Sequence, residues 1–313
     1  MGKLDISDRY GGKTSRYHLL GGLGTCSTMA RKYLAATVYI TMIFCTTFLL
    51  YCAVWLPDIK LWCKVGDSAM KGKHLDSFLL MREREHTAYN HLMSYILHPQ
   101  APCLTSRVLG GKSKRNKKKD GDKALCLEPG PGIGEDCVVY SFGIANDWSF
   151  DEDIHRKFGC QVYSFDPSMG YDDHMHSKGI WFYDLGIGEF DGQITVSDQI
   201  WNMKTFDSIL LMLGHRNKTI DVLKLDIEGA EYVVLEDMLE KGLLNHVNHL
   251  CMELHLPDNP YWTRVLKLLK RIEAEAGLRH FSTRNNTQMP LMRVPGFYAR
   301  YEQHFFEMAW YRH

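Results

Sequence analysis

The sequence has no excess of charge of either sign, because 37 lysine and arginine residues balance 37 aspartate and glutamate residues. A neutral chain presents no overall field to a polyanion, so we expect no nucleic-acid partner. The nine cysteines include no Cys-x-x-Cys pair, which argues against a zinc site made of cysteines. A hydrophobic content of 45% over 313 residues is ordinary for a globular protein, and this length allows one large domain with additional segments.

Charged residues and proline are both missing from residues 35–56, a stretch long enough to cross ~30 Å of hydrocarbon as a helix. A cleaved signal peptide would have a shorter apolar core and a small-residue cleavage site, whereas this segment ends in Trp55-Leu56-Pro57. A buried core helix is the other alternative. We predict a retained single-pass transmembrane helix, which makes the membrane a partner of the chain.

Basic residues before this segment favour a cytoplasmic amino terminus, although lysines after it keep the bias modest. The glycosylation sequons at Asn217 and Asn285 agree with a remainder that lies in the lumen of the Golgi or endoplasmic reticulum, or outside the cell. An even number of cysteines follows the segment and permits disulfides, with buried free thiols as the alternative. They are Cys63, Cys103, Cys126, Cys137, Cys160 and Cys251.

The chain divides into four predicted segments. Residues 1–34 are a disordered cytoplasmic tail, 35–56 the transmembrane helix, 57–123 a stem helix and basic linker, and 124–313 the main domain. The apolar spacing over residues 68–98 predicts a helix that ends before Pro99 and lies on the main domain. Residues 110–123 are basic and lack apolar side chains, as expected of a solvated loop.

From residue 124 onward, strand and helix patterns alternate, which predicts a doubly wound sheet of the α/β class. The expected strands are 138–144, 161–166, 180–185, 221–227 and 247–256, and the expected helices are 150–158, 229–241 and 259–276. Ser149 and Glu152 have the spacing of a capping box at the start of the first helix. Residues 281–287 and 301–311 predict two strands without a helix between them, so we expect an antiparallel hairpin on the sheet edge.

Two glycine segments compete for the loop that binds a nucleotide-like cofactor. Residues 128–134, EPGPGIG, have the pattern of such a loop, but the residues after them predict a strand. A cofactor loop should lead into a helix, whose free N–H groups face the ligand. Gly143 meets that requirement, and Asp166, the acid that ends the next strand, follows it at close to the expected interval of ~20 residues.

Asp166 is the best candidate for a cofactor contact, because a carboxylate at a strand end can accept hydrogen bonds from both ribose hydroxyls. A turn aspartate before Pro167 is the alternative. A dinucleotide needs a G-x-G-x-x-G loop around its pyrophosphate, whereas this loop offers only Gly143. S-adenosylmethionine, which has no phosphate, fits the loop better.

Residues 222–231, VLKLDIEGAE, resemble the K-x-D-x-E-G-x-E signature of FkbM-type methyltransferases, and residues 251–255, CMELH, resemble the strand end that follows it. Residues 139–151 and 163–168 resemble the methyltransferase-like protein 24 group. The similarity covers about residues 124–313. It implies a class I methyltransferase fold of seven strands with the last antiparallel, S-adenosylmethionine as cofactor, and methylation of an oxygen on a glycan or related small molecule.

The resemblance implies cofactor contacts from Gly143, Ile144, Asn146, Asp166, Asp184 and Asp226. Asp184 would reach the adenine, and Asp226 would lie near the methyl group. Asp226, Glu253 and His255 are the candidate catalytic residues. His255 is the favoured general base, because an unperturbed imidazole has a pKa of ~6.5, and a structural histidine is the alternative.

We predict no metal, although Asp226, Glu253 and His255 together could hold a divalent ion. Glu228 and Glu231 either cap the helix that follows Asp226 or contribute to the site.

Two other functions stay open. A Golgi-type glycosyltransferase would use an Asp-x-Asp motif, for which Asp151-Glu152-Asp153 is the candidate. A non-catalytic binding protein would keep the methyltransferase fold without the reaction, since a fold does not establish chemistry.

Overall fold

The computed structural model describes residues 83–113, 119–128, 132–134, 136–257, 261–294, 297 and 299–313. These residues belong to one compact unit, Ser77–His313. The predicted cytoplasmic tail and transmembrane helix, and the stem up to residue 82, lie outside the described residues. Within the described part of the chain, no helix combines the length and the apolar character needed to span a bilayer.

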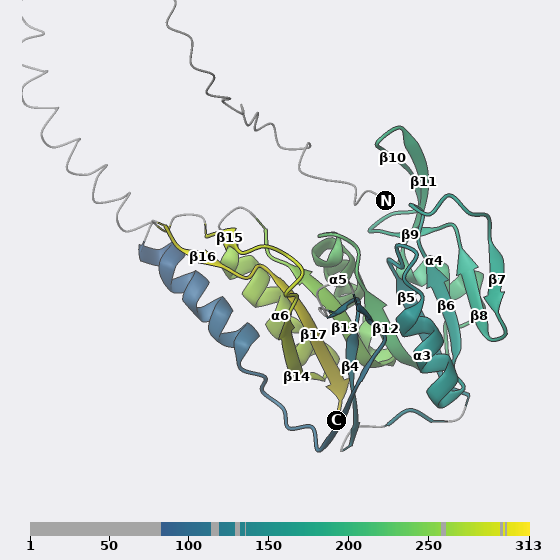
Figure 1. Ribbon diagram of the computed structural model, residues 1–313, viewed down its shortest axis with the longest axis horizontal. Helices are drawn as coiled ribbons and strands as arrows, with labels where there is room; N and C mark the ends of the chain where they lie inside the picture. Colours follow the sequence, from purple (N-terminus) through teal and green to yellow (C-terminus); the bar gives the residue numbers. More distant parts are fainter. Residues whose placement is uncertain are drawn as a thin grey trace, which may run out of the picture. The chain divides into compact units, whose positions relative to one another are not determined.

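A mixed eight-stranded sheet forms the centre of the unit, in the order β14-β17-β13-β12-β5-β6-β8-β7 (Figure 1). Its strands are β5 (Val138–Phe142), β6 (Gln161–Phe165), β7 (His174–Ser177), β8 (Ile180–Tyr183), β12 (Ile220–Leu225), β13 (Val247–His255), β14 (Leu278–Asn285) and β17 (Phe305–Arg312). The five central strands from β8 to β13 pair in parallel, and β17 is antiparallel to both of its neighbours. The α/β class is confirmed, and the mixed sheet fits the class I methyltransferase fold, with β7 as an additional antiparallel edge strand.

The last two long strands form the predicted antiparallel pair at the sheet edge. β17 lies between β13 and β14, so β14 is the edge strand. β17 is buried on both faces, with Met308 and Trp310 in one hydrophobic cluster and Ala309 and Tyr311 in the other. A strand that is apolar on both faces belongs inside a sheet that is covered on both sides.

Different elements cover the two faces of the sheet. One face packs against α4 (Phe206–Met212), α5 (Glu231–Glu240), α6 (Trp262–Ala276) and a helix over residues 83–97. The other packs against α3 (Ser149–Phe158) and the antiparallel pair of β1 (Thr105–Leu109) and β4 (Lys123–Glu128). Side chains alternate along each strand, so neighbours such as Val222 and Leu223 enter opposite clusters.

The helix over residues 83–97 lies against α6, in agreement with its apolar spacing. The fully buried Tyr89 ring packs edge-on against Trp262, with 5.1 Å between ring centroids. The hydroxyl of Tyr95 donates to the carbonyl oxygen of Leu269. These contacts make the helix part of the domain core.

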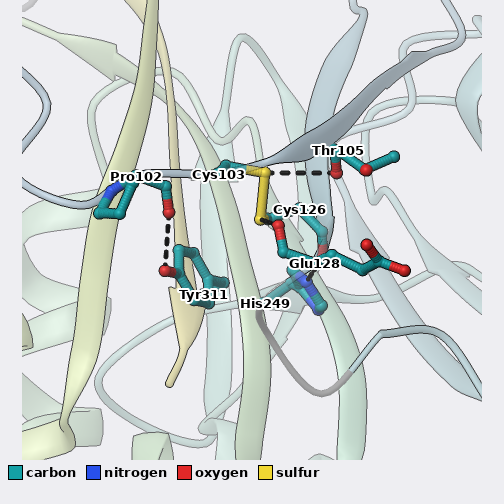
Figure 2. The surroundings of a disulfide bond; sticks show 7 residues. All are labelled: Pro102, Cys103, Thr105, Cys126, Glu128, His249 and Tyr311. Carbon is teal, nitrogen blue, oxygen red and sulfur yellow. Dashed lines mark hydrogen bonds between the residues drawn. A yellow bond between two sulfur atoms is a disulfide. The ribbon is translucent and has the colours of Figure 1, made fainter.

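Disulfides, which the cysteine count only permitted, join Cys103 to Cys126 and Cys137 to Cys160. The first ties the segment before β1 to β4, and Figure 2 shows it beside His249, whose ring nitrogen bonds to the carbonyl oxygen of Cys126. The second joins residues just before β5 and β6, at the amino ends of both strands.

The predicted capping box at the start of α3 is wrong. The Ser149 Oγ accepts a hydrogen bond from the N–H group of Gly111, and Glu152 contacts His176. The N–H group of Ser149 instead donates to the carboxylate of Asp147 (3.0 Å). A tertiary contact with the segment after β1 has therefore replaced the local motif.

Short elements complete the unit: β2 (Lys112–Ser113), β3 (Lys119–Asp120), β9 (Gly186–Ile187), β10 (Gly192–Val196), β11 (Gln199–Lys204), η2 (Leu243–His246), β15 (Met292–Arg293) and β16 (Tyr301–Glu302). In Figure 1 the hairpin of β10 and β11 projects beyond the ends of the central strands.

Candidate functional site

The bend after β5 forms the first part of the candidate site. Gly143, Ala145 and Asn146 have positive φ angles of 74°, 46° and 60°. A Cβ atom on Gly143 would overlap the carbonyl oxygen of Asp226. The N–H group of Gly143 donates to the carbonyl oxygen of Phe165 (3.0 Å). The bend therefore lies between the carboxyl ends of β6 and β12, and it leaves Ala145 and Asn146 exposed.

A buried lysine supports the bend. Lys224 on β12 is 4% exposed, and its Nζ donates to the carbonyl oxygens of Phe142 (3.1 Å) and Gly143 (2.8 Å). The sequence placed Lys224 within the family signature without assigning it a role. Its ammonium group donates to the carbonyl oxygens of the bend, of which that of Phe142 also accepts from the N–H group of Asp226 (3.2 Å).

Asp166 holds the same bend from the end of β6. Its Oδ2 accepts from the N–H groups of Ile144 (2.9 Å) and Ala145 (2.8 Å), and its Oδ1 accepts from the N–H and hydroxyl groups of Ser168 (2.8 and 2.6 Å). A carboxylate has about four acceptor positions, and these bonds use all of them. Asp166 is 4% exposed, so a ribose contact would have to displace one of these hydrogen bonds.

Asp184, which follows β8, lies on a separate part of the sheet edge. It lines a cavity of about 540 Å³ whose walls are Asp172, Asp173, Tyr183, Asp184, Leu185, Gly192, Gln193, Asn202, Met203, Lys204 and Met212. Burial and the neighbouring charges of Asp173 and Asp172 raise the pKa of Asp184. Its N–H group donates to Asp173 (2.7 Å), which fixes the two acids side by side.

Three carboxylates meet where the central strands end. Asp226 follows β12, while Glu253 on β13 and Glu307 on β17 are paired directly across the two strands. One oxygen atom from each lies within 4.8 Å of the others. All three belong to the face that is covered by α3 and β4, because alternate residues such as Cys251 and Ala309 lie on that face.

Lys123 supplies a cation to these acids. Its side chain is 1% exposed, and its Nζ lies 2.5 Å from Glu307 Oε2 and 3.3 Å from Asp226 Oδ2. The expectation that all of residues 110–123 form a solvated loop is therefore wrong at Lys123. Buried acids at this separation repel each other unless a cation lies among them, and β4 brings one.

The pKa values of Asp226 and Glu253 are shifted in opposite directions. Burial alone would raise the pKa of Asp226, but Lys123 and Lys224 outweigh it and hold that pKa below its usual range. Burial and the charge of Asp226 raise the pKa of Glu253 to about 8. At neutral pH the pair therefore combines an ionised Asp226 with a protonated Glu253, as expected for two carboxyl groups that share one site.

His255, the predicted general base, lies among carboxylates. Its Nδ1 is 3.2 Å from Glu231, and its Nε2 is 3.5 Å from Glu228 and 3.8 Å from Glu253. Burial would lower the pKa of His255, but Glu231 and Glu253 raise it to about 10. The imidazole is thus a cation at neutral pH, and the ordinary pKa on which the general-base prediction rested does not apply in the folded chain.

Glu228 and Glu231 lie in different surroundings. Glu231 is fully buried and accepts a hydrogen bond from the N–H group of Ile227 (2.9 Å), which stabilises the turn before α5. The side chain of Glu228 is 61% exposed and faces His255. Glu231 therefore supports the turn and also contacts His255, whereas a role of Glu228 in the site stays a prediction.

Among the residues that the structure describes, two groupings have the donor atoms of a divalent-cation site. Asp226 is combined with Glu228 and His255 in one, and with Glu253 and Glu307 in the other. A cationic side chain accompanies each grouping. Protonated His255 belongs to the first, and the ammonium group of Lys123 lies beside Glu307 and Asp226 of the second. The carboxylates are therefore neutralised from within the chain.

The Asp-x-Asp motif considered for a glycosyltransferase is not arranged as a metal site. Asp151 is fully buried in α3 and accepts a hydrogen bond from the hydroxyl of Ser164. Asp153 forms ion pairs with Lys157 and Arg156 on the same helix. These two acids thus serve the packing and the surface of α3.

Comparison with known proteins agrees with this geometry. The profile of a family described as a methyltransferase domain matches residues 81–270. The chain is similar to the probable methyltransferase-like protein 24 of Homo sapiens, with 35% identity over 212 residues that cover 64% of this chain and 52% of the relative. The corresponding protein of Rattus norvegicus is 33% identical over 139 residues, which cover 42% of this chain and 38% of the relative.

The match thus spans about half the length of these relatives or less. The FkbM-type signature over residues 222–231 stays a prediction, whereas the similarity to the methyltransferase-like protein 24 group is confirmed. The sheet order, the bend between β6 and β12 and the profile match lead to the same assignment. The chain belongs to the methyltransferase domain family.

Proposed function

We propose that this protein is an S-adenosylmethionine-dependent methyltransferase that methylates a hydroxyl oxygen of a glycan or related small molecule, and that residues 35–56 anchor it in a membrane. The observation that carries the proposal is the position of the Asp226 carboxyl group beside the Gly143 bend, in a chain of the methyltransferase domain family. A carboxylate at this position complements a cofactor that carries a sulfonium and an ammonium group.

The residues present fit such a cofactor. The Gly143 backbone approaches the end of β12 so closely that a side chain would not fit there, as expected of a bend that must lie close to a ligand. Asp226 would hold the amino end of the cofactor. Asp184 would bind the adenine from its cavity, where a carboxyl group can accept from an amino group or donate to a ring nitrogen.

Asp166 has a different part in this proposal from the one that the sequence suggested. It fixes the N–H groups of Ile144 and Ala145, so its main role is to maintain the bend. A ribose hydroxyl would therefore have to share the Asp166 carboxylate with these hydrogen bonds.

When bound, the cofactor would supply an electrophilic methyl group: the acceptor oxygen would form the new bond to its carbon, and the electrons of the broken carbon–sulfur bond would stay on sulfur. Glu253 is our candidate for the group that takes the hydroxyl proton: its ionised form acts as the base, and a pKa of about 8 leaves a fraction of Glu253 ionised near neutral pH. The Asn286 amide donates to Glu253 Oε1 (2.6 Å) and orients it. Protonated His255 would balance the negative charge that Glu253 carries before it takes the proton.

We infer that the domain works in an oxidising compartment, in keeping with the predicted lumenal or extracellular side. Two disulfides in one domain support this, because cytosolic thiols stay reduced. The sequon residues Asn217 and Asn285 are both exposed, as attachment of a glycan requires.

The experiment is calorimetric titration of the folded full-length chain with S-adenosylmethionine. Wild type should bind, and Asp226→Asn should weaken binding at least tenfold, because the amide cannot balance the positive charge of the cofactor. Asp198→Asn is the matched control, since Asp198 lies exposed in the β10–β11 turn with a positive φ that asparagine also tolerates.

Transfer of a labelled methyl group to a panel of glycans then separates the alternatives. Turnover supports the enzyme. Binding without turnover on any acceptor favours a non-catalytic binding protein with this fold. Absence of binding to folded wild type would contradict both.

A further inference from the structure

The carboxylate cluster at the ends of β12, β13 and β17 needs a cation. Glu253 and Glu307 face each other across paired strands, a position in which two ionised carboxylates would destabilise the sheet. Asp226 brings a third carboxylate within 4.8 Å. Burial removes the water that would otherwise screen these charges.

The cation comes from an element outside the alternating strands and helices. Lys123 begins β4, which lies across the face of β13 and β17. The thiol of Cys251 on β13 donates to the carbonyl oxygen of Ala124, the neighbour of Lys123. Arg284 on β14 donates to both the carboxylate (2.6 Å) and the carbonyl oxygen (2.9 Å) of Asp122 on the other side of Lys123.

These contacts fix the backbone on both sides of Lys123, so its ammonium group is held at one place. The Cys103–Cys126 disulfide adds a covalent tie farther along β4 (Figure 2). Several independent contacts therefore position β4, whose first side chain, that of Lys123, enters the acid cluster.

We propose that Lys123 is a positioning residue of the candidate site: its ammonium group binds Glu307 and Asp226 and holds the three carboxylates together, as a divalent cation would. The sequence that precedes the alternating strands thereby completes the site. The effect of Lys123 on the reaction rests on the proposed function, whereas the effect of Lys123 on the carboxylate cluster does not.

Charge-matched variants of the full-length chain test this. Lys123→Met keeps an apolar side chain of similar length and removes the charge, which leaves three acids without their cation. Adding Glu307→Gln removes one of these acids. Lys267→Met, at an exposed position on α6, is the control for loss of one lysine.

The first measurement is urea unfolding at pH 8, which requires no ligand. We expect Lys123→Met to lower the unfolding midpoint strongly and the double variant to recover at least half of the loss. If Lys123 acted only through packing of its stem, Lys123→Met would be close to wild type, or Glu307→Gln would add a further loss. Either result, or failure of both variants to fold, would overturn the proposal.

The second measurement is calorimetric binding of S-adenosylhomocysteine. We expect Lys123→Met to bind at least tenfold more weakly than Lys267→Met, with partial recovery in the double variant. Unchanged binding by Lys123→Met would show that Lys123 does not position Asp226. If wild type binds no S-adenosylhomocysteine while the unfolding results hold, the proposed function fails and the role of Lys123 in the cluster stands.

Discussion

At the scale of single residues, Gly143 offers the sharpest test of the bend. Its φ of 74° costs a non-glycine residue about 1–2 kcal/mol, and a Cβ atom would also overlap the Asp226 carbonyl oxygen. We expect Gly143→Ala to destabilise the chain by ~3 kcal/mol or more, since strain and overpacking add. Gly159→Ala is the control, because Gly159 has a φ of 77° with open space around it.

Urea unfolding of both variants measures the difference. Gly159→Ala should show the backbone strain alone, at about 1–2 kcal/mol. Equal losses in the two variants would mean that the backbone at Gly143 can move away from β12, and the close approach would then have no role in shaping the site.

Strand-end acids could be located from the sequence, but their partners could not. Asp166 and Asp226 were expected at the carboxyl edge because each follows an apolar run, and both lie there. The partners of Asp166 depend on the conformation of a bend some 20 residues earlier. Lys123 lies in a basic run, and only the packing of β4 distinguishes it from its solvated neighbours.

Glu307 carried a signal that could have been used. It is the only charged residue in the apolar stretch from Phe305 to Tyr311, so burial among apolar neighbours was foreseeable. The pairing of Glu307 with Glu253 was not foreseeable, because predicting it requires knowledge of the register between β13 and β17.

At the scale of elements, apolar periodicity was sufficient to predict the parallel strands and the main helices. The parallel strands are mostly apolar, with polar residues such as Lys224 and His249 at single positions, and α6 ends before Gly277 as expected. The position of β17 inside the sheet could not be predicted, because strand order depends on pairings between residues far apart in the sequence. The capping box failed for a similar reason, since the Ser149 hydroxyl bonds to Gly111.

The two disulfides predict different consequences for two elements. Each closes a loop between cysteines 23 positions apart, so its removal should cost about 3 kcal/mol of unfolding free energy. Cys137→Ser/Cys160→Ser alters the amino ends of β5 and β6, away from the site, and should leave S-adenosylhomocysteine binding unchanged. Cys103→Ser/Cys126→Ser loosens β4, and should also weaken binding because Lys123 belongs to that strand.

Unfolding and calorimetry on the two double variants check this difference. Alkylation of protein from cells before reduction should also show all four cysteines protected, which tests the oxidising compartment. Equal effects of the two variants on binding would contradict a special role for β4.

At the scale of the whole molecule, the site links the folding free energy to pH. Folding raises the pKa of Glu253 to about 8 and that of His255 to about 10, from ordinary values of 4.5 and 6.5. Between pH 6.5 and 8 these two groups therefore bind more protons in the folded chain than in the unfolded chain. The depressed pKa of Asp226 contributes stability that is already complete above pH 4 and does not change in this window.

A folded state that binds the extra protons loses stability as pH rises. Burial lowers the pKa of His215, His249 and His280, which gives the opposite slope up to about pH 7, so we expect the free energy of unfolding to fall from about pH 7 through 8 and onward toward 10. The slope should be about 1 kcal/mol per pH unit for each extra proton. Urea unfolding at pH 6, 7, 8 and 9 measures it. His255→Gln removes one titrating group and should flatten the profile, whereas His174→Gln, on the exposed edge strand β7, should leave it unchanged. A wild-type profile that is flat or rises above about pH 7 would mean that Glu231 and Glu253 do not hold His255 as a cation. Glu253, the proposed proton acceptor, would then have no protonated His255 to balance its negative charge.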